Sequence, residues 1–148
     1  MSSIFTKIIK KEIPSYILYE DDLVMAFLDI TQSTKGHTLV ITKKEYTNIM
    51  EVPEYVFTYL FSVVHKLSKI LLKTFNASGL NLVNNNGIIA GQTVLHYHVH
   101  LILRFDLNEI QINIAKPTTN LTPSYFLNIQ KQILSNISGT SLDIKKIK

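Results

Sequence analysis

Three histidines alternate with apolar or aromatic residues in the run from His96 to His100. In a β-strand, side chains two residues apart lie on the same face, about 7 Å from one another. The spacing predicts that His96, His98 and His100 line one face of a strand. The opposite, packed face is then formed by Leu95, Tyr97, Val99, Leu101 and Leu103.

Three interpretations of this histidine row stay open on spacing alone. The first is a set of buried histidines whose nitrogens are satisfied by hydrogen bonds. The second is a metal site, although three histidines on one strand span about 13 Å, which is too far for a single coordination shell. The third is catalysis, since imidazole serves as a nucleophile and a proton carrier near neutral pH. In that case His98 is the nucleophile, because partners on both sides can fix its tautomer and orientation.

The loop before the row offers hydrogen-bond donors. The segments Asn84-Asn85-Asn86-Gly87 and Ala90-Gly91-Gln92-Thr93 carry side-chain amides, a hydroxyl and glycines that expose backbone N–H groups. Such groups can hold anionic oxygens and stabilise charge in a transition state. The same composition is also typical of an ordinary turn.

The remaining sequence predicts an α+β fold around one antiparallel sheet. Apolar periodicity and turn residues define the elements. Helices are expected at 4–9 behind Ser2 and Ser3, at 53–75, and at about 123–137 behind the capping residue Thr122. Strands are expected at 16–19, 23–30, 37–41, 80–84 and 94–105, with a further edge strand at 108–115.

Composition limits the class of protein. The 148 residues suit a single domain over 1–148, and the chain has no cysteine and therefore no thiolate chemistry. The net charge of +4 comes from scattered lysines and one arginine, Arg104, which argues against nucleic-acid binding. No signal peptide and no apolar run of spanning length is evident. We expect a cytoplasmic protein without a membrane or nucleic-acid partner.

Residues 91–102 resemble the signature of the histidine-triad (HIT) superfamily, in which Gly-Gln-Ser/Thr precedes His-φ-His-φ-His-φ-φ. Earlier segments are similar to the Hint-like branch of that superfamily. These segments are 4–9, 12–15, 19–22, 26–30 and 36–41. The resemblance covers about 4–105 and leaves 106–148 as a C-terminal extension. It implies a HIT-like fold, an antiparallel five-stranded sheet with a long helix and a C-terminal helix.

The resemblance also implies roles for individual residues. His98 attacks the α-phosphorus and becomes nucleotidylated, His96 and His100 assist, and His37 holds the row. Asp29 binds the ribose hydroxyls. The positions that match phosphate and leaving-group contacts are Asn85, Gly91, Gln92 and Thr93. Ile4, Phe5, Ile8, Phe27, Ile30 and Leu39 match an apolar purine pocket, although a plain core role explains these six equally well.

The activity implied is hydrolysis of a purine nucleoside 5'-phosphoramidate or related conjugate through a nucleotidyl-histidine intermediate, without a cofactor. Asn85 favours this over dinucleoside polyphosphate hydrolysis, for which relatives carry glutamine. That activity, and a nucleotide-binding regulatory module on the same fold, remain alternatives. The family further implies a homodimer. In many bacterial relatives a Cys-x-x-Cys pair and a histidine hold a structural zinc. Here the matching positions are Ser3, Thr6 and Glu45, so that even with His100 the shell would be incomplete, and no metal is expected.

Overall fold

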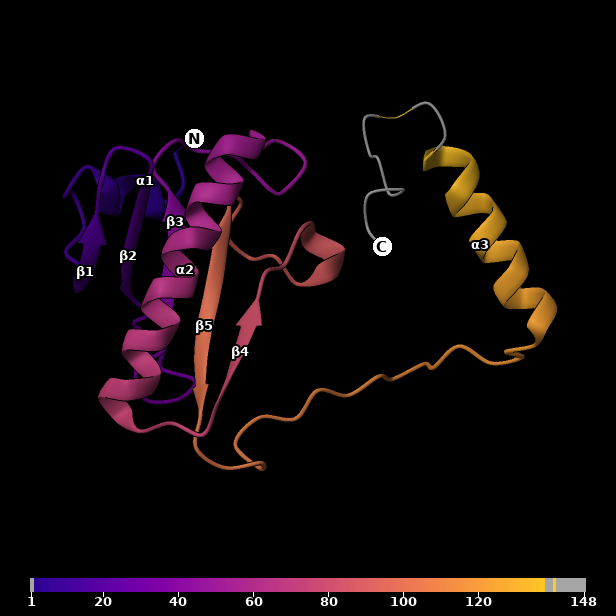
Figure 1. Cartoon of the computed structure of the whole chain (residues 1–148). Helices are drawn as coiled ribbons and strands as arrows, with labels where there is room; N and C mark the ends of the chain where they lie inside the picture. The colour runs from indigo at the N-terminus through magenta and orange to yellow at the C-terminus, as the bar shows by residue number, and fades with distance from the viewer. Residues whose placement is uncertain (1, 138–139, 141–148) are drawn as a thin grey trace. The chain divides into compact units, whose positions relative to one another are not determined.

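The computed structural model describes residues 2–137 and 140. The described chain forms a five-stranded antiparallel sheet in the order β1-β2-β3-β5-β4, which confirms the predicted fold class (Figure 1). The strands are β1 (Ile17–Glu20), β2 (Val24–Leu28), β3 (Thr38–Thr42), β4 (Gly79–Val83) and β5 (His98–Arg104). The helices are α1 (Ile4–Ile9), α2 (Glu54–Phe75), α3 (Pro123–Ile137) and the 3-10 turn η1 (Ile88–Ala90).

Strand β5 carries two of the three histidines into the middle of the sheet. It pairs with β3 on one side, where His98 faces Ile41 and His100 faces Leu39, and with β4 on the other. The predicted strand at 94–105 was too long, because β5 begins only at His98. His96 therefore lies in the approach to the strand, and Leu95 is 47% exposed rather than packed.

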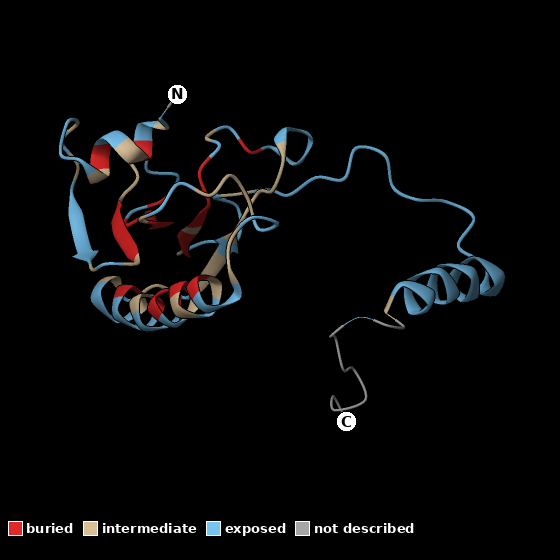
Figure 2. Ribbon diagram, turned by 90° about the horizontal axis from the view of Figure 1, so that it is seen from above, coloured by how far each residue is buried: buried red, intermediate tan, exposed pale blue. Residues whose placement is uncertain are grey.

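Helix α2 covers one face of the sheet, and α1 lies on the opposite face (Figure 2). The apolar stripe of α2 packs against residues of β5 as the alternation predicted. Among the described residues, α2 is also the one helix long and apolar enough to cross a membrane. One face of α2 is buried against the sheet, as in the core helix of a globular protein. The apolar layer between α2 and the sheet contains Leu60, Val63, Val64 and Leu71 from α2, with Tyr97, Val99, Leu101 and Leu103 from the β5 segment.

Helix α1 brings the N-terminus onto the histidine face of the sheet. Phe5 and Ile8 are buried against a second apolar cluster, which contains Met25, Phe27, Leu39 and Ile41. Ser3 caps the helix, since its Oγ accepts a hydrogen bond from the Thr6 N–H at 3.0 Å. The short α1 thus holds its N-terminal residues close to the start of β5.

After β5 the chain leaves the sheet at Arg104, whose guanidinium donates to Asn81 Oδ1 at 2.8 Å and to the Leu107 carbonyl at 3.0 Å. The edge strand expected at 108–115 is absent, and this exposed segment is irregular. The chain divides into two compact units, Met1–Ile110 and Gln111–Lys148. In the second unit Thr122 caps α3 as predicted, by accepting from the Tyr125 N–H at 3.2 Å.

Candidate active site

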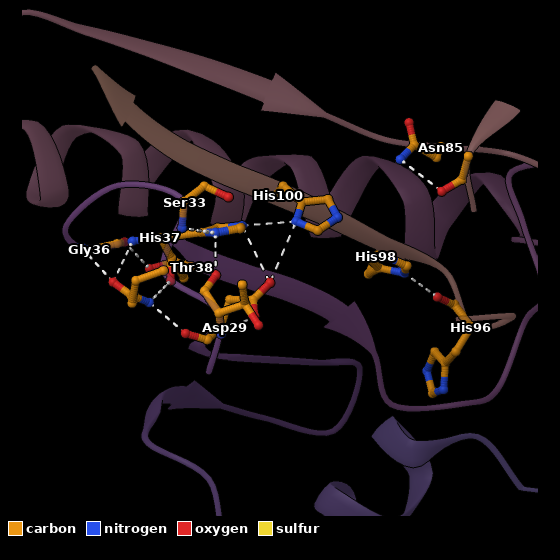
Figure 3. A network of polar contacts seen from close by, with 12 residues as sticks. Asp29, Ser33, Gly36, His37, Thr38, Asn85, His96, His98 and His100 are labelled. Atoms are coloured by element: carbon orange, nitrogen blue, oxygen red, sulfur yellow. Dashed lines mark hydrogen bonds and ion pairs between the residues drawn. The ribbon is translucent and has the colours of Figure 1, made fainter. Parts of the chain in front are cut away.

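His98, at the centre of the row, has a defined tautomer. Its Nδ1 lies 2.6 Å from the backbone carbonyl of His96, and a carbonyl can only accept, so Nδ1 carries the proton (Figure 3). Burial lowers the pKa of the His98 imidazole below its usual value, which keeps the ring neutral near pH 7. A neutral ring protonated at Nδ1 has its lone pair on Nε2, the atom that a nucleophilic histidine uses.

His96 is fixed at both ring nitrogens. Its Nε2 donates to the carbonyl of Thr42 at 2.7 Å, which leaves Nδ1 as an acceptor for the hydroxyl of Ser3, also at 2.7 Å. The side chain is fully buried, and burial lowers its pKa. The His96 ring therefore has no nitrogen left for a substrate. Instead, it holds in place the backbone carbonyl that orients His98.

A polar cluster extends from His96 to the surface through α1. The Ser3 N–H donates to Glu45 Oε1 at 3.0 Å, and Thr6 Oγ1 donates to Glu45 Oε2 at 2.6 Å. These are the three positions at which the resemblance implies that zinc ligands have been lost. The fourth residue of this cluster is His96. His100 lies at the other end of the row, so the prediction that it would belong to this group was wrong. Hydrogen bonds among Ser3, Thr6, Glu45 and His96 join α1 to the approach to β5.

His100 stands at the other end of the row beside His37 and Asp29. Its Nδ1 lies 2.9 Å from His37 Nε2. The Asp29 Oδ2 atom lies 3.5 Å from His37 Nε2 and 3.9 Å from His100 Nδ1 (Figure 3). Burial, together with the neighbouring imidazoles, lowers the pKa of His100 to about 4. The structure thus brings His37 to the row, where the resemblance implied that it would lie.

The proton between His37 and His100 has two consistent positions. If His37 Nδ1 donates to the Thr31 carbonyl at 3.1 Å, its Nε2 accepts from His100 Nδ1. If His37 Nδ1 instead accepts from the Ser33 N–H at 3.2 Å, its Nε2 donates and His100 carries its proton on Nε2. The two arrangements differ by a proton shift along the pair, so this end of the row can take up or release a proton.

An apolar pocket of about 180 Å³ lies beside the row. Phe5 links the two, because its ring packs edge-on against the His98 ring with centroids 5.1 Å apart. The structure brings together the residues expected to hold a purine and a ribose. These lining residues are Ile4, Phe5, Ile8, Phe27, Ile30 and Leu39, with the carboxylate-bearing Asp29.

The loop before the row has one residue that serves the fold. The Gln92 side chain is buried, donates to the carbonyls of Thr47 at 2.6 Å and Val94 at 3.0 Å, and accepts from the Gly87 N–H at 2.8 Å. Both hydrogens of the Gln92 amide and its oxygen thus have partners within the fold, so the side chain holds the loop in place, and its contact with substrate stays a prediction. Asn85 and Thr93 remain available, because Asn85 makes only a long 3.5 Å contact to the Gly91 carbonyl and Thr93 is exposed. Gly91 is exposed as well, but its N–H donates to the Ile88 carbonyl at 3.0 Å.

Sequence reasoning missed the partners that make His96 and His37 rigid. The Thr42 and Thr31 groups that contact these rings are backbone carbonyls, for which the residue type carries no signal. The contact between Ser3 and His96 was only partly predictable from the sequence. A serine at a helix start marks a cap but does not indicate what else its hydroxyl binds.

Comparison with known proteins gives consistent results. The model of the HIT domain matches residues 10–107. Protein hit of Bacillus subtilis is 49% identical over 102 residues, which are 69% of this chain and 70% of that protein. The adenosine 5'-monophosphoramidase of Candida albicans is 40% identical over 109 residues, 71% of this chain and 72% of the relative. The crystal structure of a HIT family member from Bacillus subtilis superimposes with a TM-score of 0.85 at 38% identity, covering 95% of this chain and all of that one.

Proposed function

Since the chain belongs to the HIT domain family, we propose that it is a nucleotide-binding hydrolase that cleaves purine nucleoside 5'-phosphoramidates. The observation that carries the proposal is the 2.6 Å contact from His98 Nδ1 to the His96 carbonyl, because it leaves the Nε2 lone pair as a nucleophile. The similarity to an adenosine 5'-monophosphoramidase supports this bond type.

The reaction has two steps. His98 Nε2 attacks the α-phosphorus, a bond forms between them, and the phosphorus–nitrogen bond to the leaving amine breaks. The amine takes up a proton, which the pair of His37 and His100 can deliver. Water then attacks the phosphorus and returns a proton to the pair of His37 and His100, the bond to His98 breaks, and a nucleoside monophosphate is released. Donors on the preceding loop, the Asn85 amide and the Thr93 hydroxyl, stabilise the charge on the phosphoryl oxygens.

The pocket beside the row suits a nucleoside. Apolar side chains such as Phe5, Phe27 and Leu39 offer surfaces for a flat base, and Asp29 at the same pocket offers a carboxylate for the ribose hydroxyls. A site with a deeper second nucleotide pocket would favour dinucleoside polyphosphates. Asn85, with its short side chain, favours a small leaving group such as an amine.

A two-fold homodimer completes the proposed assembly. On α2 the apolar residues Tyr55 and Ile70 are 66% and 56% exposed, and on α3 Phe126 and Leu127 are 56% and 64% exposed. Apolar surface of this extent is a binding surface or an aggregation risk, and a closed dimer covers it. Light scattering at micromolar concentration should give twice the chain mass of 16.9 kDa. A stable monomer at that concentration would contradict the dimer.

The decisive experiment traps the covalent intermediate. The wild-type protein is mixed with an adenosine phosphoramidate, quenched rapidly and weighed intact, with a diadenosine polyphosphate as the comparison substrate. We expect a nucleotidylated protein that His98→Ala cannot form, and a fall in turnover of roughly 10⁴-fold or more in that variant. His65→Gln, on the exposed side of α2, is the matched control and should behave as wild type. Near wild-type turnover by His98→Ala would overturn the proposal.

A further inference from the structure

We infer that Asp29, His37 and His100 form a binding site for a divalent transition metal such as zinc, placed so that the bound ion blocks the histidine row. Three donor atoms from separate parts of the chain meet there: His37 Nε2, His100 Nδ1 and Asp29 Oδ2. Two imidazoles and one carboxylate, with an open fourth position, are a donor set that zinc accepts.

The distances between the donor atoms fit the size of the ion. They are 2.9 Å between the two histidine nitrogens, 3.5 Å from Asp29 to His37 and 3.9 Å from Asp29 to His100. The point equidistant from the corners of this triangle lies about 2.0 Å from each atom, which is the length of a zinc–nitrogen or zinc–oxygen bond. A tetrahedral shell has edges of about 3.3 Å, so the two nitrogens need to separate by about 0.4 Å and Asp29 Oδ2 needs to approach His100 Nδ1 by about 0.6 Å.

The surroundings already orient two of the donors as a metal site requires. His37 Nδ1, the nitrogen that would not bind the ion, lies 3.1 Å from the Thr31 carbonyl, which accepts its proton in the tautomer that leaves Nε2 free for the ion. Asp29 Oδ1 accepts from the Thr31 N–H at 2.8 Å, which leaves Oδ2 facing the histidines (Figure 3). Such outer contacts hold the first-shell ligands of metal sites in orientation.

The ion can reach the site, and its entry has a simple chemical balance. The side chains of His100 and Asp29 are 21% and 19% exposed, whereas His37 is 4% exposed and forms the floor. The ion takes the place of the proton between His37 Nε2 and His100 Nδ1. Each imidazole then stays neutral, with its one proton on the nitrogen that does not bind the ion, so that binding releases no net proton. Water or a phosphate oxygen fills the fourth position.

The other polar cluster near the row does not offer the same site. Around His96 the donors are the hydroxyls of Ser3 and Thr6 and the carboxylate of Glu45, and hydroxyls are poor zinc ligands at neutral pH. His96 also has both nitrogens committed, to Ser3 and to the Thr42 carbonyl. The proposal therefore assigns metal binding to the His100 end of the row alone.

Occupation of the site has a consequence that rests on the proposed function. An ion on His100 and His37 removes the pair that would deliver a proton to the leaving group, and it ties up Asp29 beside the nucleoside pocket. Zinc should then inhibit phosphoramidate hydrolysis reversibly, and a chelator should restore the rate.

The test measures binding first and activity second. Cobalt(II) is titrated into the metal-free protein, and its visible d–d absorption reports a four- or five-coordinate site. We expect one ion per chain, with at least tenfold weaker binding in Asp29→Asn and in His37→Gln, and unchanged binding in the control His65→Gln. Absence of binding at roughly millimolar metal, or binding that survives both substitutions, would overturn the proposal.

A second measurement keeps the test valid if a variant fails to fold. In the wild-type protein, zinc should shift the ring-nitrogen NMR signals of His37 and His100 and leave those of His65 and His96 unchanged. Shifts confined to His96 or His65 would contradict the site. If metal binds as described but no phosphoramidate is hydrolysed, the proposed function fails and the metal site stands.

Discussion

The two ends of the histidine row use the same residue type in opposite ways. At one end His96 is fully buried and hydrogen-bonded at both ring nitrogens, to Ser3 and to the Thr42 carbonyl. At the other end His100 is partly exposed and shares one proton with His37, with the Asp29 carboxylate nearby. One end has a single allowed tautomer and the other has two.

In the proposed mechanism, this difference separates a histidine that holds the fold from one that can transfer a proton. A ring whose nitrogens both have fixed partners cannot transfer a proton without breaking its surroundings, whereas a ring in a pair with two proton positions can. His98, between them, depends on both ends: His96 supplies the carbonyl that fixes its tautomer, and His100 lies on the same face of β5 with its ring centroid 5.1 Å away. The role of each histidine is therefore set by its neighbours.

Replacing His100 is the most direct test of the contrast between the two ends of the row. In His100→Gln the amide keeps a polar group of similar length but cannot carry a proton. We expect turnover of the phosphoramidate to fall by roughly 10²- to 10⁴-fold, the usual contribution of a general acid or base. The melting temperature should change little, because His100 is partly exposed. Steady-state kinetics and thermal melts test both statements, and a variant with wild-type turnover would show that His100 is not part of the chemistry.

The pH dependence of the free energy of unfolding is a second test, because it shows whether the rings of the row are held neutral in the fold. Burial lowers the pKa of His96 and His98, and that of His100 falls to about 4, so these rings stay neutral in the fold while the unfolded chain titrates near 6.5. Between pH 6.5 and 4 the unfolded state then binds more protons, and stability is lost as the pH falls through this window.

From pH 7 to pH 5, His100 alone should cost about 2 kcal/mol of unfolding free energy. Urea denaturation at the two pH values measures this difference. His100→Gln should show a correspondingly smaller loss, and His65→Gln should follow the wild type. A free energy of unfolding that is equal at pH 7 and pH 5 would mean that the rings are not held neutral in the fold.

Most of the fold could be predicted because its elements have regular patterns. The apolar stripe of α2 and the alternation along β5 specify which faces are buried, and both appear in the structure. The exceptions are at element ends. Leu95 continues the alternation in sequence but lies outside the strand, because His96 instead bonds to the Thr42 carbonyl and Tyr97 to Tyr46. Alternation alone does not show where pairing begins.

The site likewise has features that the sequence indicates and features that it does not. Spacing pointed to His98 as the candidate nucleophile, and the family resemblance pointed to His37 and to the lining of the apolar pocket, since these proposed roles belong to the side chains themselves. The fixed tautomer of His96 could not be predicted, because it depends on a backbone carbonyl far along the chain. Gln92 shows the same limit: its amide is as suitable for holding a loop as for binding a phosphate, and only the structure shows that it is buried and hydrogen-bonded to Thr47 and Gly87.

The smallest predicted effect concerns the contact that fixes the His96 end. In Ser3→Ala the helix loses its cap and His96 Nδ1 loses its donor, while the ring remains buried. Loss of a cap costs about 1 kcal/mol and an unsatisfied buried acceptor a similar amount, so we expect a loss of about 1–2 kcal/mol in unfolding free energy. Turnover should fall by less than about tenfold, because the bond from His96 Nε2 to Thr42 still holds the ring.

The matched control is Glu45→Gln, at the exposed end of the same cluster. Its amide oxygen can still accept from Thr6 or from the Ser3 N–H, and exposed ionic contacts contribute little, so its cost should stay below about 1 kcal/mol. Urea denaturation of both variants gives the comparison, and the ring-nitrogen NMR signals of His96 show whether the Nε2–H tautomer persists. If Glu45→Gln proved more damaging than Ser3→Ala, the surface charge rather than the buried hydroxyl would be holding His96. The contrast between a closed and an open end of the row would then need a different physical basis.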